Sequence, residues 1–508
     1  MTRISRFRLP PSLTCKDKAK GRPPASCYNF CMRGLRLLLQ FSLLTVTAWF
    51  TPATSGEPSQ IARIAAEISP DRLMESVREL SRLEGRQSGT PGGDAAAAYI
   101  ASRLPQATLQ PFPVRTLQTR SSVQATIRTD RFLQALQAGR DFIPVLSHVP
   151  TALITSPVVF VGYGIADPVQ GLDEYAGLAV TGKVVLFLRG QPKRYAGRVT
   201  HRDKVRTARA KGAIAYLTVT GPVLAPYEQR RGMSQRPMGL YDGGITDTLP
   251  GLWLAPAVAA ALLEPVGVTL ESFQGDMDRT LAAGSLETKS TITLEMEQSQ
   301  SDATASNVVA LWAGSDPAFR HETIILGAHH DHFGAQAGLV FPGADDNASG
   351  TAILLEVARV LASTGASPKR SILFIAFAGE EQGLLGSHFY VSNPDRPLLT
   401  TKAMINVDHA GVGNGKITAG LSRLDKAVAQ GAAAKVALGE KLELFGLFPG
   451  GDHVPFAEAG IPTATIVSSG PHPDFHQPTD TSEKINPEVL VTIARYTLAL
   501  LWTLADEP

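Results

Sequence analysis

Residues 327–350 read "GAHHDHFGAQAGLVFPGADDNASG" and gather three histidines and three aspartates in 24 residues. The run that leads into this stretch, "ETIILGAH", is apolar and typical of a buried strand. The run that follows, "GTAILLEVARVLAST", has apolar residues at helical spacing. The stretch therefore predicts a strand and a helix with candidate metal ligands crowded between them.

The same alternation of strand and helix continues from residue 302 to the C-terminus. Apolar strand-like runs occur at 371–379, 403–411 and 463–470, and helical patterns occur at 424–439 and 487–505. The run "SILFIAFAG" is apolar throughout, as expected for a strand covered on both faces. This order predicts an α/β fold, a three-layer sandwich with a mixed, mostly parallel central sheet.

The rest of the chain has different hydrophobic patterns. Residues 57–105 have helical periodicity, whereas residues 154–290 hold short β-runs bounded by glycine, such as "PVVFVGYG" and "GKVVLFLRG". The length of 508 residues favours at least two domains. A net charge of +2 gives no indication of nucleic acid or of an anionic membrane as a partner.

The N-terminal part has the layout of an export signal. Residues 33–56, "RGLRLLLQFSLLTVTAWFTPATSG", place two arginines before a short apolar stretch that ends in small residues. A membrane span needs about 20 apolar residues, so an uncleaved anchor is the weaker alternative. Translation starts at Met1 or at Met32, and residues 1–55 are excluded from the fold. We expect a secreted or periplasmic protein with no stable membrane association after cleavage.

Cysteine is confined to the first 31 residues, at Cys15, Cys27 and Cys31. A metal site in the folded part must therefore use imidazole and carboxylate. Nine of the 11 histidines lie between His321 and His476.

The candidate ligands fall at the carboxyl ends of the predicted strands, where open α/β sheets bind their ligands. Five chain segments contribute, with these residues: His329 and Asp331, Asp345 and Asp346, Glu380 and Glu381, Asp408, and His476. Each one alone has an ordinary explanation, such as a helix cap, a helix-dipole partner or a surface histidine. Those explanations do not account for their coincidence, nor for paired carboxylates directly after an apolar strand.

Histidine and carboxylate without thiolate favour zinc. Two histidines and three carboxylates are too many for one catalytic zinc, which takes three protein ligands. They fit two Zn²⁺ ions if one carboxylate is shared, and such a pair can hold a water and polarise a carbonyl.

Six stretches carry a family resemblance: "GAHHDHFG", "PGADDNASG", "FAGEEQGLLGS", "INVDHAG", "DFHQPTDT" and, upstream, "LEGRQSGTPGG". They resemble the motifs of the di-zinc exopeptidases of clan MH, which include bacterial leucyl aminopeptidases and glutamate carboxypeptidase. The resemblance covers 302–508 closely and extends to 70–105. It implies a zinc-dependent exopeptidase, an aminopeptidase that removes N-terminal residues from peptides with a water bridging the two metals.

The resemblance also implies a role for each residue. His329, Asp346 and Asp408 would bind the first zinc, and Asp346, Glu381 and His476 the second. Glu380 would be the general base and Asp331 would hold the ring of His329. Asp345 is the less favoured bridge, and His330 and His332 would line the site. His388 and His472 would have no catalytic role.

This sequence departs from the family at positions that affect the substrate rather than the chemistry. His330 stands where tyrosine is common, His409 where methionine is common, and a glycine precedes Asp452 where serine is usual. Asp452 and His453 are expected to shape the substrate pocket.

The middle segment, with "DEYAG" and "GKVVL", resembles a protease-associated domain. The implied organisation is a β-rich domain at 151–290 inserted into a catalytic domain made of 56–150 and 291–508. We expect the insert to limit access to the cleft.

Three alternatives remain open. A carboxypeptidase of the glutamate type would need arginines for substrate carboxylates, for which Arg230, Arg231 and Arg236 are candidates. A single-zinc glutaminyl cyclase would not need the full ligand set. A non-catalytic binding protein of the same architecture, such as the transferrin receptor ectodomain, would have lost ligands.

Overall fold

The computed structural model describes residues 59–147, 149, 151–224, 228–229, 232–242, 248–282 and 284–507. The predicted export segment at 33–56 lies outside the described residues, as do Arg230 and Arg231.

A mixed sheet forms the middle layer of the catalytic part. Its strand order is β18 (Leu442–Phe445), β17 (Ile417–Ser422), β19 (Thr463–Ser468), β16 (Thr401–Val407), β12 (Thr323–His329), β15 (Ser371–Phe377), β11 (Leu286–Trp312) and β1 (Thr108–Thr119). Strands β19, β16, β12 and β15 pair in parallel. Strand β11 runs antiparallel to β15, and β17 antiparallel to β19. The predicted mixed, mostly parallel sheet is confirmed.

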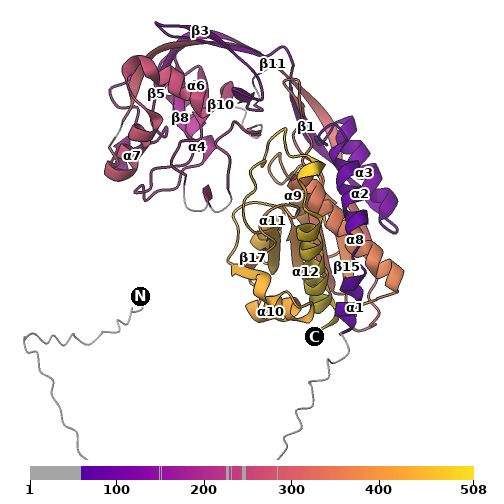
Figure 1. Ribbon diagram of the computed structural model, residues 1–508. Helices are drawn as coiled ribbons and strands as arrows, with labels where there is room; N and C mark the ends of the chain where they lie inside the picture. Colours follow the sequence, from indigo (N-terminus) through magenta and orange to yellow (C-terminus); the bar gives the residue numbers. More distant parts are fainter. Residues whose placement is uncertain are drawn as a thin grey trace, which may run out of the picture. The chain divides into compact units, whose positions relative to one another are not determined.

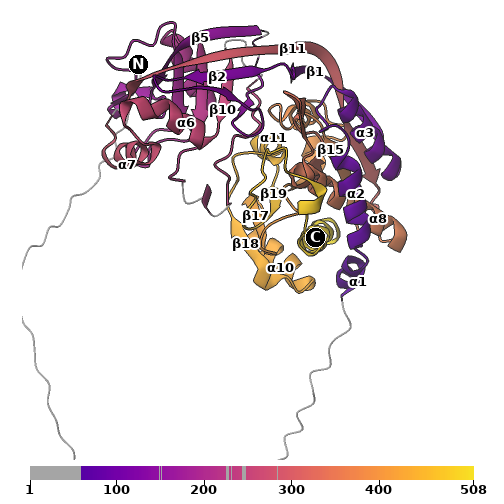
Figure 2. The ribbon, with the colours of Figure 1, turned by 45° about the horizontal axis from the view of Figure 1, so that its top comes forward.

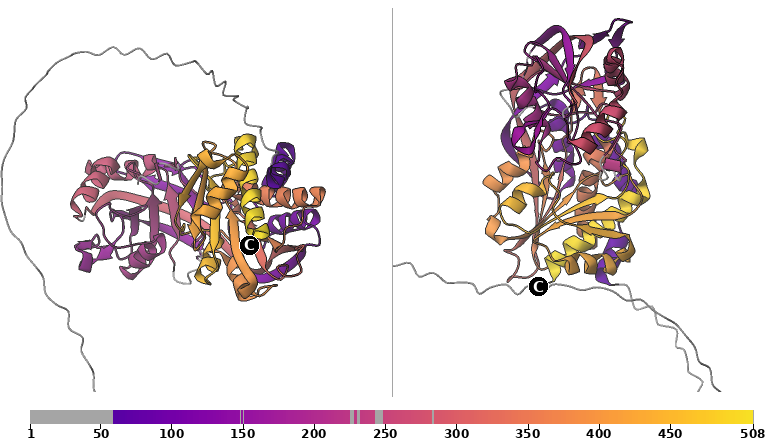
Figure 3. Two further views of the ribbon diagram at one scale, coloured as in Figure 1. Left: turned by 90° about the horizontal axis from the view of Figure 1, so that it is seen from below. Right: turned by 90° about the vertical axis from the view of Figure 1, so that its left-hand side faces the viewer.

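Helices cover both faces of this sheet, because its central strands are apolar on both sides. In β12, Ile324 and Leu326 face one core, whereas Ile325 faces the other. The first face carries α1 (Gln60–Ala66), α2 (Pro70–Ser81), α3 (Pro91–Arg103), α8 (Ser349–Thr364), α10 (Lys426–Lys435) and α12 (Pro487–Asp506). The second face carries α9 (Leu385–Ser392) and α11 (His453–Glu458). Figures 1 and 3 show α12 close to the N-terminal helices.

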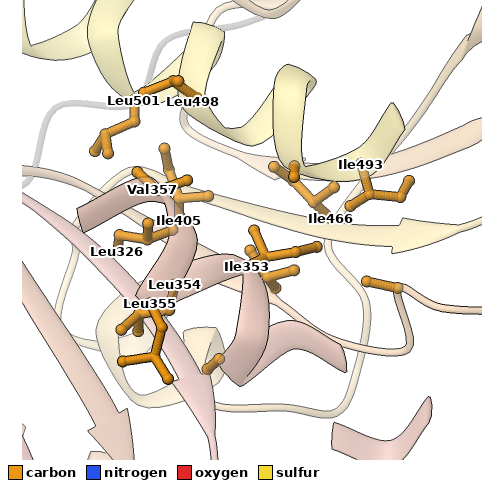
Figure 4. Close-up of a cluster of buried hydrophobic side chains, with 14 of the residues drawn as sticks. Leu326, Ile353, Leu354, Leu355, Val357, Ile405, Ile466, Ile493, Leu498 and Leu501 are labelled. Carbon is orange, nitrogen blue, oxygen red and sulfur yellow. The ribbon is translucent and has the colours of Figure 1, made fainter. Parts of the chain in front are cut away.

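The larger core lies between α8, α12 and the sheet. Ile353 and Val357 of α8 and Leu498 of α12 meet Leu326 and Ile405 of the strands (Figure 4). Helix α12 is long and apolar enough to cross a membrane, but 78% of its apolar window is buried inside the protein. Its apolar surface is therefore explained by the sandwich core.

The second part of the structure is built on the same long strand. Residues 286–297 of β11 pair with β5 (Thr151–Phe160) and residues 291–295 with β2 (Gln124–Arg128). The sheet continues through β8 (Val184–Leu188), β9 (Ala215–Val219), β10 (Gly251–Leu254) and β4 (Phe142–Pro144), and β3 (Leu133–Leu136) pairs with β2. Figure 2 shows β11 running on past β1 to β2 and β5.

This second sheet has cores of its own. Helix α4 (His201–Ala210) packs on one face, and α6 (Pro256–Leu263) and α7 (Leu270–Thr280) pack on the other. The core under α6 and α7 also contains Ile127 and Phe142, which precede the predicted start of the insert at 151. Four further strands are short: β6 (Ala166–Asp167), β7 (Leu172–Asp173), β13 (Gly334–Gln336) and β14 (Leu339–Phe341).

Candidate metal centre

Three neighbouring strands deliver the first ligands to one edge of the catalytic sheet. Strand β12 ends at His329, which is in register with Phe377, the last residue of β15. Glu380 and Glu381 follow Phe377, and Asp408 follows the end of β16. Because these strands are parallel and adjacent, their carboxyl ends bring residues from distant parts of the sequence together.

The turn that carries Asp346 is held by contacts to several other segments. The peptide bond between Asp346 and Asn347 is cis, and the side chain of Asn347 donates to the Val407 carbonyl at 2.9 Å. The carboxylate of Asp480 accepts the backbone N–H groups of Asp345 and Asp346 at 2.9 and 3.0 Å. The turn therefore presents the Asp346 side chain in a fixed direction at the start of α8.

Asp346 lies between two histidines. Its Oδ1 is 3.3 Å from His329 Nε2, and its Oδ2 is 3.1 Å from His476 Nε2. Asp408 Oδ1 is 3.4 Å from His329 Nε2, and Glu381 Oε2 is 3.4 Å from His476 Nε2. The structure thus brings all five predicted ligands together as two groups of three that share Asp346.

The separations fit two zinc ions. Donors that share one tetrahedral zinc at about 2.0–2.1 Å lie about 3.3 Å apart, which matches the four distances around Asp346. The predicted ligand set therefore has the spacing that the metal requires.

The expected tautomers of the two histidines also favour a metal site. Nδ1 of His476 faces the Gly239 carbonyl at 3.1 Å, and Nδ1 of His329 faces the Asp331 carbonyl at 3.3 Å. A carbonyl only accepts, so each Nδ1 carries the proton in the neutral ring and each Nε2 is left with a lone pair. Both lone pairs then face carboxylate oxygens, an arrangement that a cation between them would satisfy.

The electrostatic balance of the site is strongly negative. Burial and the charge of Asp346 raise the pKa of Glu381 to about 8. Burial also raises the pKa of Glu380 well above its ordinary value, helped by Glu381, Asp452 and Asp408. Among the described side chains, Asp408 Oδ1 and Asp331 Oδ2 are buried and accept no hydrogen bond. Buried carboxylates in excess are costly unless a cation neutralises them.

Glu380, the predicted base, lines a cavity of about 380 Å³ together with His329, Asp346 and Asp408. Its backbone N–H donates to Asp331 Oδ1 at 3.1 Å. The same carboxylate oxygen lies 3.7 Å from His329 Nδ1, which is beyond direct hydrogen-bond distance. Asp331 thus bonds directly to the Glu380 backbone, and its carboxylate lies near the ring of His329 without a hydrogen bond to it.

Two further histidines form hydrogen bonds around the centre. His332 Nδ1 is 2.6 Å from Glu381 Oε1, and His472 Nδ1 is 2.6 Å from Asp345 Oδ2. These pairs are closer than two ligands of one tetrahedral zinc, so they are direct hydrogen bonds. His332 therefore orients the ligand Glu381, and His472 holds Asp345 beside the shared Asp346.

Asp452 and His453 are the residues expected from the sequence to shape the substrate pocket. His453 bonds to Thr465 Oγ1 at 2.6 Å and to the Phe448 carbonyl at 3.1 Å, and Phe448 and Thr465 line the cavity. Asp452 is fully buried, and burial raises its pKa to about 7. His330 contacts the Ser306 carbonyl at 3.3 Å. His388 is exposed on α9.

Three supporting residues were missed by the sequence reasoning. Asp480 holds the Asp346 turn, although it lies in the quoted motif "DFHQPTDT". Arg86 is fully buried and donates to the carbonyls of His330, Pro342 and Gly343 at 2.8, 2.5 and 2.8 Å. Arg189 lines the cavity from the inserted part and pairs with Glu228 at 2.5 Å.

The part of the chain that carries this centre matches a known peptidase family. Residues 307–501 match the profile of Peptidase family M28. The chain is 27% identical to "Aminopeptidase YwaD" of Bacillus subtilis (strain 168), over 90% of this chain and 91% of the relative. It is 26% identical to "Probable glutamate carboxypeptidase VP8" of Zea mays, over 80% of this chain and 60% of the relative.

A solved structure supports the fold. The aminopeptidase from Aneurinibacillus sp. strain AM-1 superposes with a TM-score of 0.63 at 24% identity, and the match covers 88% of this chain and 96% of that one. The resemblance in architecture therefore extends over both parts of the structure.

Proposed function

We propose that the chain belongs to peptidase family M28, whose profile residues 307–501 match, and that it is a zinc-dependent aminopeptidase that removes N-terminal residues from peptides. The observation that carries the proposal is the position of Asp346, whose two oxygens face His329 and His476 at 3.3 and 3.1 Å.

Two zinc ions are proposed, each with three protein ligands. His329, Asp346 and Asp408 would hold one, and Asp346, Glu381 and His476 would hold the other. When bound, zinc polarises the scissile carbonyl and lowers the pKa of the attacking water. Asp331, His332 and Gly239 contact these ligands from outside and limit how far the histidine rings and Glu381 can turn.

Glu380 is the residue that we assign to proton transfer. It lines the cavity beside the ligand groups, and its backbone is tied to Asp331. Its carboxylate accepts a proton from the attacking water and passes it to the amine nitrogen of the leaving peptide. Burial and neighbouring carboxylates raise its pKa, which favours holding that proton between the two transfers.

The arginines that the structure describes at the cavity do not favour a substrate carboxylate. Asp346, Glu381 and Asp408 line the cavity as proposed zinc ligands, and Glu380 is the lining carboxylate outside that set. Arg189 also lines it, but Glu228 accepts from its guanidinium at 2.5 Å. Arg236, a candidate for carboxylate recognition, is bound to Asp474 at 2.9 Å instead.

The test uses aminoacyl-p-nitroanilides and peptides with free or acetylated amino ends, with and without a chelator. We expect cleavage of free amino ends only, loss of activity on chelation and recovery with Zn²⁺. Release of C-terminal residues from acetylated peptides would instead identify a carboxypeptidase.

Export is the second part of the proposal. Residues 33–56 carry the charge and apolar pattern of a signal peptide. N-terminal sequencing of the mature protein from a fractionated host should place the first residue near 56, and a start at Met1 in the cytosolic fraction would contradict export.

A further inference from the structure

One loop of the inserted part, residues 232–241, contacts the segment that carries His476, and we call it the docking loop. It lies against the loop of residues 471–480, which carries His476. Gly239 N–H donates to the His476 carbonyl at 2.8 Å, and His476 Nδ1 donates to the Gly239 carbonyl at 3.1 Å. A residue of the insert therefore holds both the backbone and the ring of His476.

Arg236 and Pro237 extend this contact. The guanidinium of Arg236 donates to Asp474 Oδ1 at 2.9 Å, to the Pro473 carbonyl at 3.2 Å and to Thr479 Oγ1 at 3.4 Å. The Pro237 carbonyl accepts the side-chain amide of Gln477 at 3.0 Å. Residues on both sides of His476 are thus bound to the docking loop.

The backbone of His476 needs such support. Its φ is 54°, in the left-handed region, where a non-glycine residue is strained by about 1–2 kcal/mol. The ring is also packed between Phe475, whose ring lies at 3.7 Å, and Phe333 at 4.7 Å between centroids. The contacts from the docking loop help to keep a strained residue in one conformation.

The loop is in turn anchored in the insert. The side-chain amide of Gln235 donates to the Pro222 carbonyl at 3.3 Å, and Leu240 packs against the core that contains Val185 and Val205. A movement of the insert would therefore be transmitted to the position of His476.

We infer that the docking loop fixes the tautomer and orientation of His476, so that the inserted part sets the zinc affinity of the second of the two proposed sites. Arg236 and Gly239 are positioning residues in this scheme. The inference rests on the proposed function and gives the insert a role at the metal, in addition to any limit on access.

The experiment measures both zinc affinities of the full-length protein by calorimetry and chelator competition. The variant His476→Ala identifies which of the two affinities belongs to the second site. In Arg236→Ala we expect that affinity to fall about 10-fold, since partners that orient a metal ligand typically contribute 10- to 100-fold. The first affinity should stay unchanged, and Arg236→Lys should restore part of the loss.

A second variant tests the same contact from the backbone. A Cβ at Gly239 would lie 3.1 Å from Phe333 Cδ2, so Gly239→Ala should shift the loop and lower the second affinity again. Arg131→Ala is the matched control, because it removes another exposed arginine, which lies between β2 and β3 and pairs with Glu264 of the insert at 2.5 Å.

The outcomes separate the two proposals. Two zinc ions in the wild type with unchanged second affinity in Arg236→Ala and Gly239→Ala would overturn the inference alone. Fewer than two ions in the fully loaded wild type would overturn the proposed function and the inference with it.

Discussion

Two of the places where the described residues bury charge differ in how that charge is satisfied. In the insert cluster, which consists of Tyr163, Glu174, His201, Lys204 and Asp278, the charged atoms have backbone partners. Glu174 accepts the N–H groups of Tyr163 and Ile165 at 2.9 and 2.8 Å. Lys204 Nζ donates to the carbonyls of Leu188, at 2.8 Å, and Gly190.

In the metal centre, by contrast, carboxylates outnumber cationic groups. Oxygens of Asp346 and Asp408 lie 3.3 and 3.4 Å from His329 Nε2. Burial opposes a positive charge on this ring, but the surrounding carboxylates raise its pKa well above the ordinary value. Buried charge is therefore not in itself evidence of a site. Buried charge that is unbalanced and lacks donors indicates that a cation belongs there.

The largest effect is expected when Asp346, the ligand shared by both proposed zinc sites, is removed. Asp346→Ala would leave each group with two protein ligands, fewer than a zinc site normally has. We expect both ions to be lost and kcat/KM to fall by about 1,000-fold or more, because metal catalysis supplies several kcal/mol. Metal analysis and kinetics measure this. Glu174→Gln, in the insert cluster, should keep both ions, and two ions in Asp346→Ala would refute the shared role.

The next effect separates chemistry from metal binding. Glu380→Gln removes the proton acceptor but keeps the shape of the side chain, so kcat should fall by about 100- to 10,000-fold. Zinc content should stay at the wild-type value, since Glu380 is not one of the proposed ligands. A variant with near-normal kcat would show that another group carries the proton.

Three of the proposed ligands could be located from the sequence because each follows the end of an apolar strand. An apolar strand that stops at "GAHHD", "AGEE" or "NVDH" places polar side chains at a sheet edge, whatever the distant chain does. His329, Glu381 and Asp408 could thus be placed before the structure was known.

Residues that act across the fold gave no such signal. Asp480 and Arg86 bond to backbone groups of segments more than 100 residues away, and their own neighbours in sequence do not indicate those partners. The polar alternation in residues 286–306 also concealed that β11 is one strand of 27 residues shared by both sheets. The docking loop is a further case, since its contact with His476 depends on how the insert packs.

The third prediction tests the insert cluster. Lys204 is buried, and burial lowers its pKa to about 7. Lys204→Met would leave the buried Glu174 without its cation and two carbonyls without a donor, which should cost about 3 kcal/mol of unfolding free energy. Urea unfolding measures the loss. Lys211→Met, at an exposed pair with Asp173 at 3.7 Å, should change stability by less than about 0.5 kcal/mol. If Lys204→Met also bound zinc more weakly, the insert cluster would be coupled to the metal centre, and the two could not be treated as separate sites of buried charge.

The smallest expected effect is a pH dependence in the same cluster. Burial, with the charges of Lys204 and Arg189, lowers the pKa of His201 to about 3, whereas an unfolded histidine has a pKa of about 6.5. Between about pH 3 and 6.5 the unfolded chain binds a proton that the native ring does not, so stability falls as the pH falls.

His201→Gln cannot titrate, and the amide can still reach the hydroxyl of Tyr216, which lies 3.3 Å from His201 Nε2. From pH 6.5 to 5 this variant should lose about 1–2 kcal/mol less unfolding free energy than the wild type. Glu174, whose pKa burial raises to about 7, acts in the opposite direction in both proteins and cancels in their difference. Tyr216→Phe removes the hydrogen bond but keeps the imidazole, so it should destabilise equally at both pH values. Identical pH slopes in the wild type and His201→Gln would show that the ring is protonated in the native insert, and hence that this cluster too contains an unbalanced charge.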